Sequence, residues 1–304
     1  MIMIETRLLQ YFLAIAREQN ITRAAEVLHI TQPTLSKQMQ DLEAQIGRPL
    51  LIRSHKKTTL TEDGLYLKNR AEEILKLLEH TENSFRQSDL DIGGDISIGC
   101  GEFASLQPVM KLISSIHHQY PDIHFHFLSG NGDEMIENLD KGLVDFAFVS
   151  DPEFSERFDY YLLPFQEYWG MIVCDDDPAA QKESVSLHDL EGRELLIPIR
   201  FQNGSRFQHL LAESGIQLNV CGTFTLLYNA ARLIQEGYAA GVTMGHLTER
   251  FEGLSWVPFD PPVASQLYMV TKKYQTGSRA CMRFIDELKN AGLCSALKNR
   301  NSEN

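Results

Sequence analysis

One segment near the N-terminus restricts the possible folds of this chain more than any other. It begins with Thr31 and Pro33, which is typical of a helix start because proline is tolerated in a first turn. Apolar residues then follow a 4-3-4 spacing over roughly residues 32–46, so they share one face of a helix: Leu35, Met39, Leu42 and Ile46. Gly47 suits the C-terminal end. The chain must therefore bury one side of this helix.

A second face of the same helix is polar and carries no acidic residue. It presents Gln32, Pro33, Ser36, Lys37 and Gln40, whereas Asp41 and Glu43 are expected to lie away from it. Amides, a hydroxyl and one cation on a helix that is buried on its other side suit the major groove of DNA. Taken alone, an ordinary solvated face explains this pattern better. The neighbouring elements therefore decide between the two interpretations.

Short elements flank this helix on both sides. The apolar spacing of residues 8–16 predicts a helix, and Thr22 is predicted to cap a short helix over residues 23–28. After Gly47, two short apolar strands at residues 49–53 and 58–61 enclose a basic loop. We expect a hairpin, or wing, whose Arg53, Lys56 and Lys57 are available to phosphates.

Charge is distributed unevenly along the chain. Residues 1–61 contain eight Lys/Arg and five Asp/Glu, a balance of +3, although the whole chain carries −13. Residues 62–90 carry −3, so residues 91–304 hold a charge equal to the full −13. An acidic body discourages indiscriminate binding to DNA and leaves that contact to the basic N-terminal module.

A long helix is predicted to follow the hairpin, from a Thr61 cap to about Ser88. Glu62 and Asp63 lie in its first turn, where the helix dipole favours acidic groups. Six residues then repeat with a 4-3-4-3-4 spacing, which forms an a/d seam: Leu67, Ala71, Ile74, Leu78, Thr81 and Phe85. We expect the same helix of a second chain to cover this seam. The alternative is packing against the chain's own body.

Residues 89–94 form a hinge into a second part, in which strands and helices alternate. The expected strands include residues 160–165, 169–174 and 266–271, and the expected helices include residues 226–236. Alternation of this kind predicts mostly parallel sheets covered by helices on both faces. Roughly two hundred residues are enough for two such lobes.

Composition argues against several classes of protein. No apolar run reaches the ~18–20 residues of a membrane span, and no signal peptide is recognisable, so we expect a cytoplasmic protein. The five cysteines lie far apart and form no C-x-x-C, which predicts reduced, mostly buried thiols, with a redox switch as the less favoured alternative. His117-His118 and His124-x-His126 lack completing ligands, so we expect no metal site and no cofactor.

Together these features resemble the LysR-type transcriptional regulators. The matching residues run in order and without a gap through the N-terminal part: Leu9–Ala16, Ile21–Leu28, Thr31–Gln38, Leu42-Glu43, Ile46-Gly47, Pro49-Leu50, Arg53, Leu60-Thr61 and Gly64. Further matches lie at residues 121–123, 139–147 and 237–242. The wing departs from the family, since Leu51 replaces the usual Phe and Ser54-His-Lys-Lys57 stands where Gly and Arg are common. This departure affects fine sequence preference rather than fold.

The resemblance implies a fold class and a domain plan. The fold class is α/β with an N-terminal all-α winged helix-turn-helix, a long linker helix, and a two-lobed effector domain like a periplasmic binding protein. The implied domains are a DNA-binding domain at residues 4–61, a linker and dimerisation helix at 62–91, and an effector-binding domain at 92–304. Lobe I would comprise residues 92–161 and 265–297, and lobe II residues 162–264.

The resemblance also implies which residues contact DNA. Gln32, Pro33, Ser36 and Lys37 should meet the major groove, with Gln40 on the same face. Residues near helix ends suit phosphates, namely Asn20, Thr22, Thr31 and Gln38. Arg53 and Lys56 suit backbone or minor-groove contacts of the wing.

The effector is expected to bind where strands meet helices, since oriented backbone N–H groups there favour anions. The junctions are residues 100–103, 129–131, 150, 198–201, 223–224 and 245–246. Within them we assign effector binding to Cys100, Gly101, Glu102, Phe103, Ser129, Asn131, Ser150, Arg200, Phe201, Thr223 and His246. Glu102 stands where many relatives have Ser or Thr. We expect it either to pair with Arg200 or to favour a cationic or amphoteric ligand.

The implied protein is a sequence-specific transcription factor and not an enzyme. Its partners would be double-stranded DNA with dyad symmetry, an unknown small-molecule effector and a second copy of itself, with a tetramer usual in the family, RNA polymerase as a further partner, and no membrane. Two alternatives stay open: an architectural DNA-binding dimer without an effector, and a DNA-binding domain fused to an α/β enzyme. The chain contains no G-x-S-x-G, Walker A or G-x-G-x-x-G motif.

Overall fold

The computed structural model of the chain describes residues 4–53, 57–85, 92–199, 206–245, 251–273 and 278–297. The chain divides into two compact units, residues 1–86 and residues 87–304. No helix in the described ranges is long and apolar enough to cross a membrane. We call these unit 1 and unit 2.

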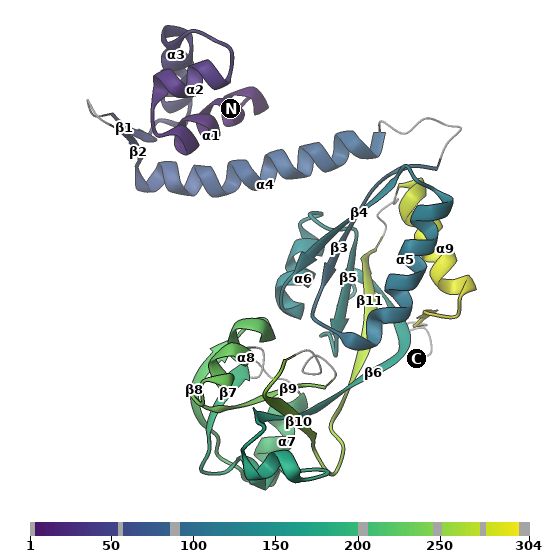
Figure 1. The fold of residues 1–304 in the computed structure, drawn as a ribbon. Helices are drawn as coiled ribbons and strands as arrows, with labels where there is room; N and C mark the ends of the chain where they lie inside the picture. Colours follow the sequence, from purple (N-terminus) through teal and green to yellow (C-terminus); the bar gives the residue numbers. More distant parts are fainter. Residues whose placement is uncertain are drawn as a thin grey trace. The chain divides into compact units, whose positions relative to one another are not determined.

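Unit 1 contains three packed helices, a hairpin and a long helix (Figure 1). The elements are α1 (Thr6–Glu18), α2 (Ile21–Val27), α3 (Gln32–Ile46), β1 (Leu51–Arg53), β2 (Thr58–Leu60) and α4 (Glu62–Phe85). The apolar stripe predicted on α3 packs into the core of this unit, where Leu35, Met39 and Leu42 are at most 1% exposed. β1 and β2 pair antiparallel as the predicted hairpin. Residues 54–56 of the wing lie outside the described residues.

The starts of the short helices are set by polar side chains. Thr31 caps α3 by accepting a hydrogen bond from the Thr34 backbone N–H at 3.3 Å, as predicted. The prediction that Thr22 caps α2 is wrong. Asn20 is the cap, because its backbone is extended and its side chain accepts a hydrogen bond from the Arg23 N–H at 3.1 Å. The helix therefore begins two residues earlier than expected, and Ile21 joins the core.

The long helix α4 begins at the predicted cap, where Thr61 Oγ1 accepts a hydrogen bond from the Gly64 N–H at 2.9 Å. Its predicted seam divides into two parts. Leu67 and Ala71 pack against the core of unit 1, so this part of the seam is covered within the chain and not by a second copy. Ile74 is 47% exposed and Thr81 is also exposed, so this part of the seam remains available to a partner. The side chain of Phe85 lies outside the described residues.

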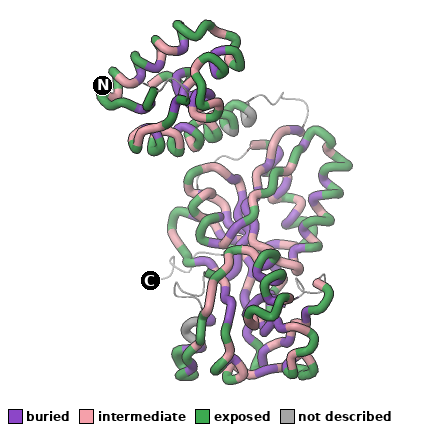
Figure 2. Tube along the Cα trace, turned by 60° about the vertical axis from the view of Figure 1, so that its left-hand side comes forward, coloured by how far each residue is buried: buried purple, intermediate pink, exposed green. Residues whose placement is uncertain are grey.

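Unit 2 contains two groups of strands and helices, for which we keep the terms lobe I and lobe II (Figure 1). Lobe I has β3 (Gly94–Cys100), α5 (Gln107–Gln119), β4 (Ile123–Ser129), α6 (Gly132–Asp140), β5 (Phe146–Ser150), α9 (Arg279–Asn290) and β12 (Ser295–Ala296). Lobe II has β7 (Glu194–Pro198), α7 (Arg206–Ser214), β8 (Asn219–Phe224), α8 (Leu227–Gln235), β9 (Ala240–Met244) and β10 (Leu254–Pro258). Each lobe has its own buried apolar clusters beneath exposed helix faces (Figure 2).

Two long strands run through both lobes. β6 (Phe158–Cys174) pairs antiparallel with β11 (Ala264–Lys272), and it also pairs with β9 and β10 of lobe II. The prediction of two separate strands at residues 160–165 and 169–174 is therefore wrong. The register shifts between Gln266 and Tyr268, and the Gln266 side chain donates hydrogen bonds to the carbonyls of Leu163 and Phe165. This side chain satisfies the backbone around Pro164, so the strand continues past a residue that usually ends one.

The sheet is mixed rather than mostly parallel. β3 pairs in parallel with β4 and β5, and β7 pairs in parallel with β8 and β9. β11 and β6 enter these parallel groups antiparallel. The prediction of mostly parallel sheets is wrong because the crossing strands connect the two groups in the opposite direction.

Candidate functional sites

The polar face of α3 is exposed on unit 1. Gln32, Pro33, Lys37 and Gln40 are exposed, and Ser36 is half-buried. The structure therefore places the five residues of the predicted strip on the outer side of a helix whose inner residues Leu35, Met39 and Leu42 are buried. Side chains of this length on such a helix can reach the base edges of a duplex.

The hairpin is fastened to α3 by Glu43. Its Oε1 accepts hydrogen bonds from the backbone N–H groups of Leu50 and Leu51, at 2.8 and 3.0 Å. Its Oε2 lies 3.4 Å from Arg53 Nη2, and Arg53 Nη1 donates to Ser36 Oγ at 3.3 Å. The expectation that Glu43 lies away from the strip is wrong. Glu43 follows Ser36 by seven residues, which is close to two helical turns, so the two side chains lie on the same side of α3. Arg53 is thus held beside the strip rather than projecting from the wing.

The other predicted DNA-contact residues lie at helix ends or on the flank of α3. Asn20, Thr22 and Thr31 are exposed near the N-termini of α2 and α3, and Gln38 is half-buried. Asn20 and Thr31 already use their side chains as caps. Lys56 lies outside the described residues.

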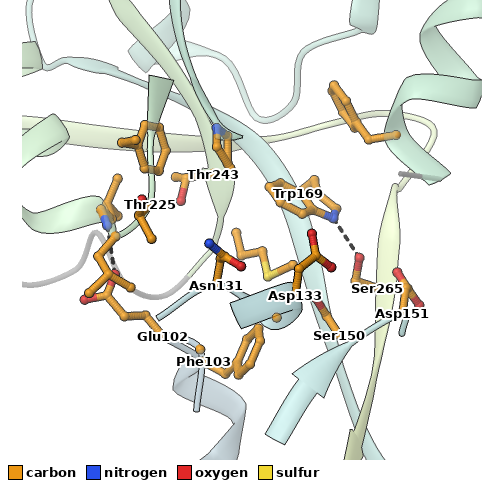
Figure 3. A pocket seen from close by; sticks show the side chains of 18 of the residues that line it. Glu102, Phe103, Asn131, Asp133, Ser150, Asp151, Trp169, Thr225, Thr243 and Ser265 are labelled. Carbon is orange, nitrogen blue, oxygen red and sulfur yellow. Dashed lines mark hydrogen bonds between the residues drawn. The ribbon is translucent and has the colours of Figure 1, made fainter. Parts of the chain in front are cut away.

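A pocket in unit 2 lies between strand ends of lobe I and the N-terminus of α8 in lobe II (Figure 3). Five of the predicted effector residues line it: Gly101, Glu102, Phe103, Asn131 and Ser150. Three do not, namely Cys100, Ser129 and Thr223. Arg200, Phe201 and His246 lie outside the described residues.

Strand geometry explains why these three residues, which were predicted to bind the effector, do not line the pocket. Side chains of a strand alternate between two faces, so Phe224 lines the pocket while the neighbouring Thr223 is exposed on the other face. Cys100 points into the apolar cluster of lobe I, and its thiol donates to the Gly101 carbonyl. Ser129 ends β4 at the edge of the sheet and is exposed.

Several pocket residues were not predicted. They come from the segment after β5, from α6 and β9, and from the crossing strands β6 and β11: Asp133, Asp151, Glu153, Trp169, Thr243 and Ser265. Trp169 Nε1 donates a hydrogen bond to Ser265 Oγ at 2.8 Å, which fixes the indole between β6 and β11 (Figure 3). No local motif distinguishes these residues from ordinary strand and loop residues.

Glu102 connects the two lobes across the pocket. Its Oε2 accepts a hydrogen bond from the backbone N–H of Leu227, the first residue of α8, at 2.8 Å. A carboxylate is favoured there because the first N–H groups of a helix lack partners within the helix. The alternative pairing of Glu102 with Arg200 falls outside the described residues.

Two family profiles match the chain over most of its length. The profile of bacterial regulatory helix-turn-helix proteins of the lysR family matches residues 6–65, and the profile of the LysR substrate binding domain matches residues 91–292. The chain belongs to the family of LysR-type transcriptional regulators. The family is not one of enzymes, and the predicted fold class is confirmed.

Similar proteins include named LysR-type regulators. A hydrogen peroxide-inducible genes activator from Pectobacterium carotovorum subsp. carotovorum is 29% identical over 189 residues, which is 62% of this chain and 62% of that protein. The Hca operon transcriptional activator HcaR of Escherichia coli (strain K12) is 29% identical over 245 residues, 79% of this chain and 81% of HcaR. The chain thus matches less than two thirds of the length of the first relative.

Solved LysR-type structures share the fold. Full-length CbnR complexed with its target DNA superposes with a TM-score of 0.74 at 22% identity, covering 95% of this chain and all of the CbnR chain. At this identity the likeness shows the common architecture alone.

Proposed function

We propose that this LysR-type regulator binds a specific DNA sequence through α3 and changes transcription when a small molecule occupies the pocket of unit 2. The observation that carries the proposal is the polar strip on the outer side of α3, which lies opposite the buried side chains of Leu35, Met39 and Leu42. CbnR, which shares the fold, is a LysR-type regulator solved with its target DNA. The protein acts in the cytoplasm, where bacterial DNA lies.

The decisive experiment tests base reading by Lys37. A duplex is first selected from a randomised library with the wild-type chain, and a dyad-symmetric sequence is expected to emerge. Binding of wild type and Lys37→Ala to this duplex and to a scrambled duplex is then measured by fluorescence anisotropy at one salt concentration. Lys37→Ala is expected to weaken binding to the selected duplex by about 1–3 kcal/mol and to change the scrambled duplex much less.

A matched control is Lys111→Ala, which removes a cation from an exposed position of α5 in unit 2. It is expected to leave both affinities unchanged. Equal weakening of both duplexes by Lys37→Ala would instead assign this residue to the phosphate backbone. Failure to select any sequence would overturn specific DNA binding altogether.

The architectural alternative, a DNA-binding dimer without an effector, is less well supported than the regulator. Unit 2 contains a pocket whose lining mixes aromatic and polar side chains from both lobes, which is the usual composition of a small-molecule site. Peroxide sensing, which the name of one relative suggests, is not favoured for three of the cysteines. Cys100, Cys281 and Cys294 are buried in lobe I, and burial raises the pKa of each thiol.

A further inference from the structure

The chain's own carboxylate occupies the place in the pocket that would best hold an anion. The first N–H groups of α8 have no partner within the helix, its N-cap residue Leu226 supplies no side-chain cap, and this end of the helix dipole is positive. Glu102 Oε2 of lobe I accepts the Leu227 N–H there at 2.8 Å. An anionic ligand at this end of the pocket would have to displace Glu102 and would meet its negative charge. The arrangement therefore disfavours a carboxylate or phosphate next to α8 and favours a donor group on the ligand.

A second carboxylate lies on the pocket side of the crossing strands. Glu167 and Trp169 share one face of β6, and Glu167 stands directly opposite Ser265 of β11. Trp169 and Ser265 both line the pocket, and Glu167 lies beside them on the same face of the sheet without lining the pocket itself. Glu167 is 1% exposed.

Only one oxygen of Glu167 is satisfied by the described residues. Oε1 accepts a hydrogen bond from the Ser105 backbone N–H at 2.9 Å. Within the described ranges Oε2 has no hydrogen-bond partner, and neither has Ser105 Oγ. A buried carboxylate oxygen in this condition is stabilised by a donor or a positive charge brought close to it. A cation in the adjoining pocket would bring a positive charge to the face of the sheet on which Glu167 lies.

Aromatic rings supply the remaining wall of the pocket. Trp169 is held by Ser265 and lies 5.9 Å from the Phe207 ring, and Phe103 and Phe224 also line the pocket. Aromatic faces attract organic cations, and Trp does so most strongly. No Lys, Arg or His occurs among the lining residues that the structure describes, whereas acidic residues come from both the end of β5 and the start of α6.

We propose that the pocket binds a small organic ammonium ion, with Glu102 as its carboxylate partner and the aromatic rings around its carbon skeleton. A charge-assisted N–H···O hydrogen bond to Glu102 is compatible with the bond that Glu102 already accepts from Leu227, since a carboxylate has several acceptor positions. The inference rests on the proposed function, because it names the chemical class of effector for the same site.

The test compares amines with acids of the same skeleton on the full chain. Both tryptophans, Trp169 and Trp256, lie in unit 2, so tryptophan fluorescence reports the unfolding of this unit. Benzylamine and butylamine are compared with benzoate and butyrate at about 10 mM and neutral pH. At least one amine is expected to raise Tm by about 2 °C or more, with no comparable shift from its acid. Stabilisation by the acids alone, or by none of the four, overturns the proposal.

A variant pair then tests Glu102 itself. Glu102→Gln keeps an acceptor oxygen for the Leu227 N–H but removes the charge, so affinity for the stabilising amine is expected to fall about tenfold. Glu213→Gln makes the same change of charge on the exposed face of α7, outside the pocket, and is expected to bind the amine as wild type does. Equal amine affinity in Glu102→Gln and wild type would remove Glu102 from the site.

These results are separable from the proposed function. Selection of a DNA sequence by the ligand-free chain requires no amine, and amine binding followed by fluorescence requires no DNA. If the chain binds an amine but selects no DNA sequence, the proposed class of ligand is supported and the proposed function as a sequence-specific regulator is overturned. If the chain selects a DNA sequence but does not respond to amines, the proposed function is supported and the proposed class of ligand is overturned.

Discussion

At Gly64, α4 passes so close to the segment before the hairpin that a side chain would not fit. A Cβ built on Gly64 would lie 2.1 Å from the Leu50 carbonyl oxygen and 3.3 Å from Leu60 Cβ. Leu50 is fixed in turn by its hydrogen bond to Glu43. Absence of a side chain at this position is what allows the wing, α3 and α4 to meet.

Gly64→Ala is expected to destabilise unit 1 by about 1–3 kcal/mol, because the new methyl group meets immobile backbone. Helix propensity alone predicts the opposite sign, since Ala is favoured over Gly inside a helix by roughly 0.5–1 kcal/mol. Chemical unfolding followed by circular dichroism at 222 nm measures the change. Gly47→Ala is a useful comparison, because Gly47 has open space and a φ of +76°, so that only backbone strain of about 1 kcal/mol is expected. Stabilisation by Gly64→Ala would contradict the close approach.

The cysteines of lobe I are expected to be unreactive in the folded protein. Burial raises the pKa of the Cys100 thiol to about 12, and burial together with the nearby Asp145 charge raises that of Cys281 to about 12. The thiolate is the reactive form, so these groups are expected to react with Ellman's reagent at pH 8 more than about tenfold slower than in the unfolded chain. Rapid oxidation of Cys100 or Cys281 by peroxide in the native protein would contradict this prediction and would favour the alternative of a redox switch.

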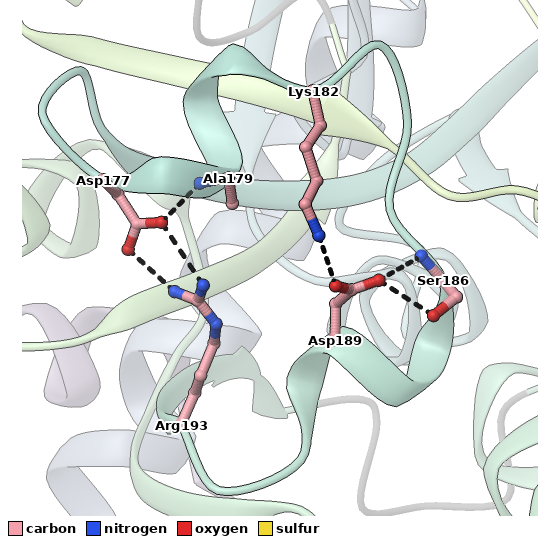
Figure 4. Close-up of polar contacts among 6 residues, drawn as sticks. All are labelled: Asp177, Ala179, Lys182, Ser186, Asp189 and Arg193. Carbon is pink, nitrogen blue, oxygen red and sulfur yellow. Dashed lines mark hydrogen bonds and ion pairs between the residues drawn. The ribbon is translucent and has the colours of Figure 1, made fainter.

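Among the elements, the two 3-10 turns between β6 and β7 depend on carboxylates (Figure 4). Asp189 accepts hydrogen bonds from the Ser186 N–H and Oγ, at 2.7 and 2.8 Å, and lies 2.6 Å from Lys182 Nζ. These contacts, the Lys182 bond above all, hold the pKa of Asp189 at about 2. Asp189 thus forms the capping box of the second turn and, through Lys182, connects it to the end of the first.

Removal of this charge by Asp189→Asn is expected to lower the stability of unit 2 by about 1–2 kcal/mol at pH 7, a modest cost because Lys182 is half exposed. The pKa of Asp189 is lower in the folded chain than its ordinary value of 3.8, so its contribution is complete above about pH 4 and is lost as pH falls toward about 2. The difference between variant and wild type should therefore shrink between pH 4 and about 2. Urea unfolding followed by tryptophan fluorescence measures it. Asp286→Asn, on the exposed face of α9, is the control. A difference that is constant over this pH range would contradict the assignment.

At the scale of the whole molecule, the exposed part of α4 is the proposed dimer contact. Ile74 and Leu77 are 47% and 42% exposed, and Leu78 is half-buried beside them. An apolar face of this size on a helix that is otherwise polar favours a second copy of the same helix. A dimer presents two copies of α3 to one duplex, as a dyad-symmetric operator requires.

Ile74→Arg is expected to shift the protein from dimer to monomer and to weaken binding to the selected duplex at least about tenfold, since each α3 would then bind one half-site alone. Light scattering after size-exclusion chromatography gives the mass, and anisotropy gives the affinity. Asn69→Arg adds the same charge to the opposite, exposed side of α4 and should change neither. A dimer that survives Ile74→Arg at low protein concentration would place the contact elsewhere.

Local patterns predict the elements well where each pattern is complete within one segment. The stripe, the cap and the C-terminal glycine of α3 are all within residues 31–47, and the observed helix agrees with them. β6 is different, because Pro164 looks like a strand end until Gln266, more than one hundred residues away, satisfies the neighbouring carbonyls. The pocket is predicted only in part for the same reason. Its junction residues follow strands visibly, but Trp169 and Ser265 are adjacent only because β6 pairs with β11.

The sequence by itself determined the exposed polar strip of α3, the winged module and the family, since these depend on contacts between residues close in the chain and on helical periodicity. Tertiary structure decided the remainder. Pairing of distant strands carried Trp169 and Ser265 to the pocket, and packing on α1 removed Leu67 and Ala71 from the dimer seam. The same long-range packing brought Glu102 to the first N–H of α8, a contact between residues 125 positions apart. Such contacts form only after the chain has closed long loops, so no pattern within a single segment predicts them.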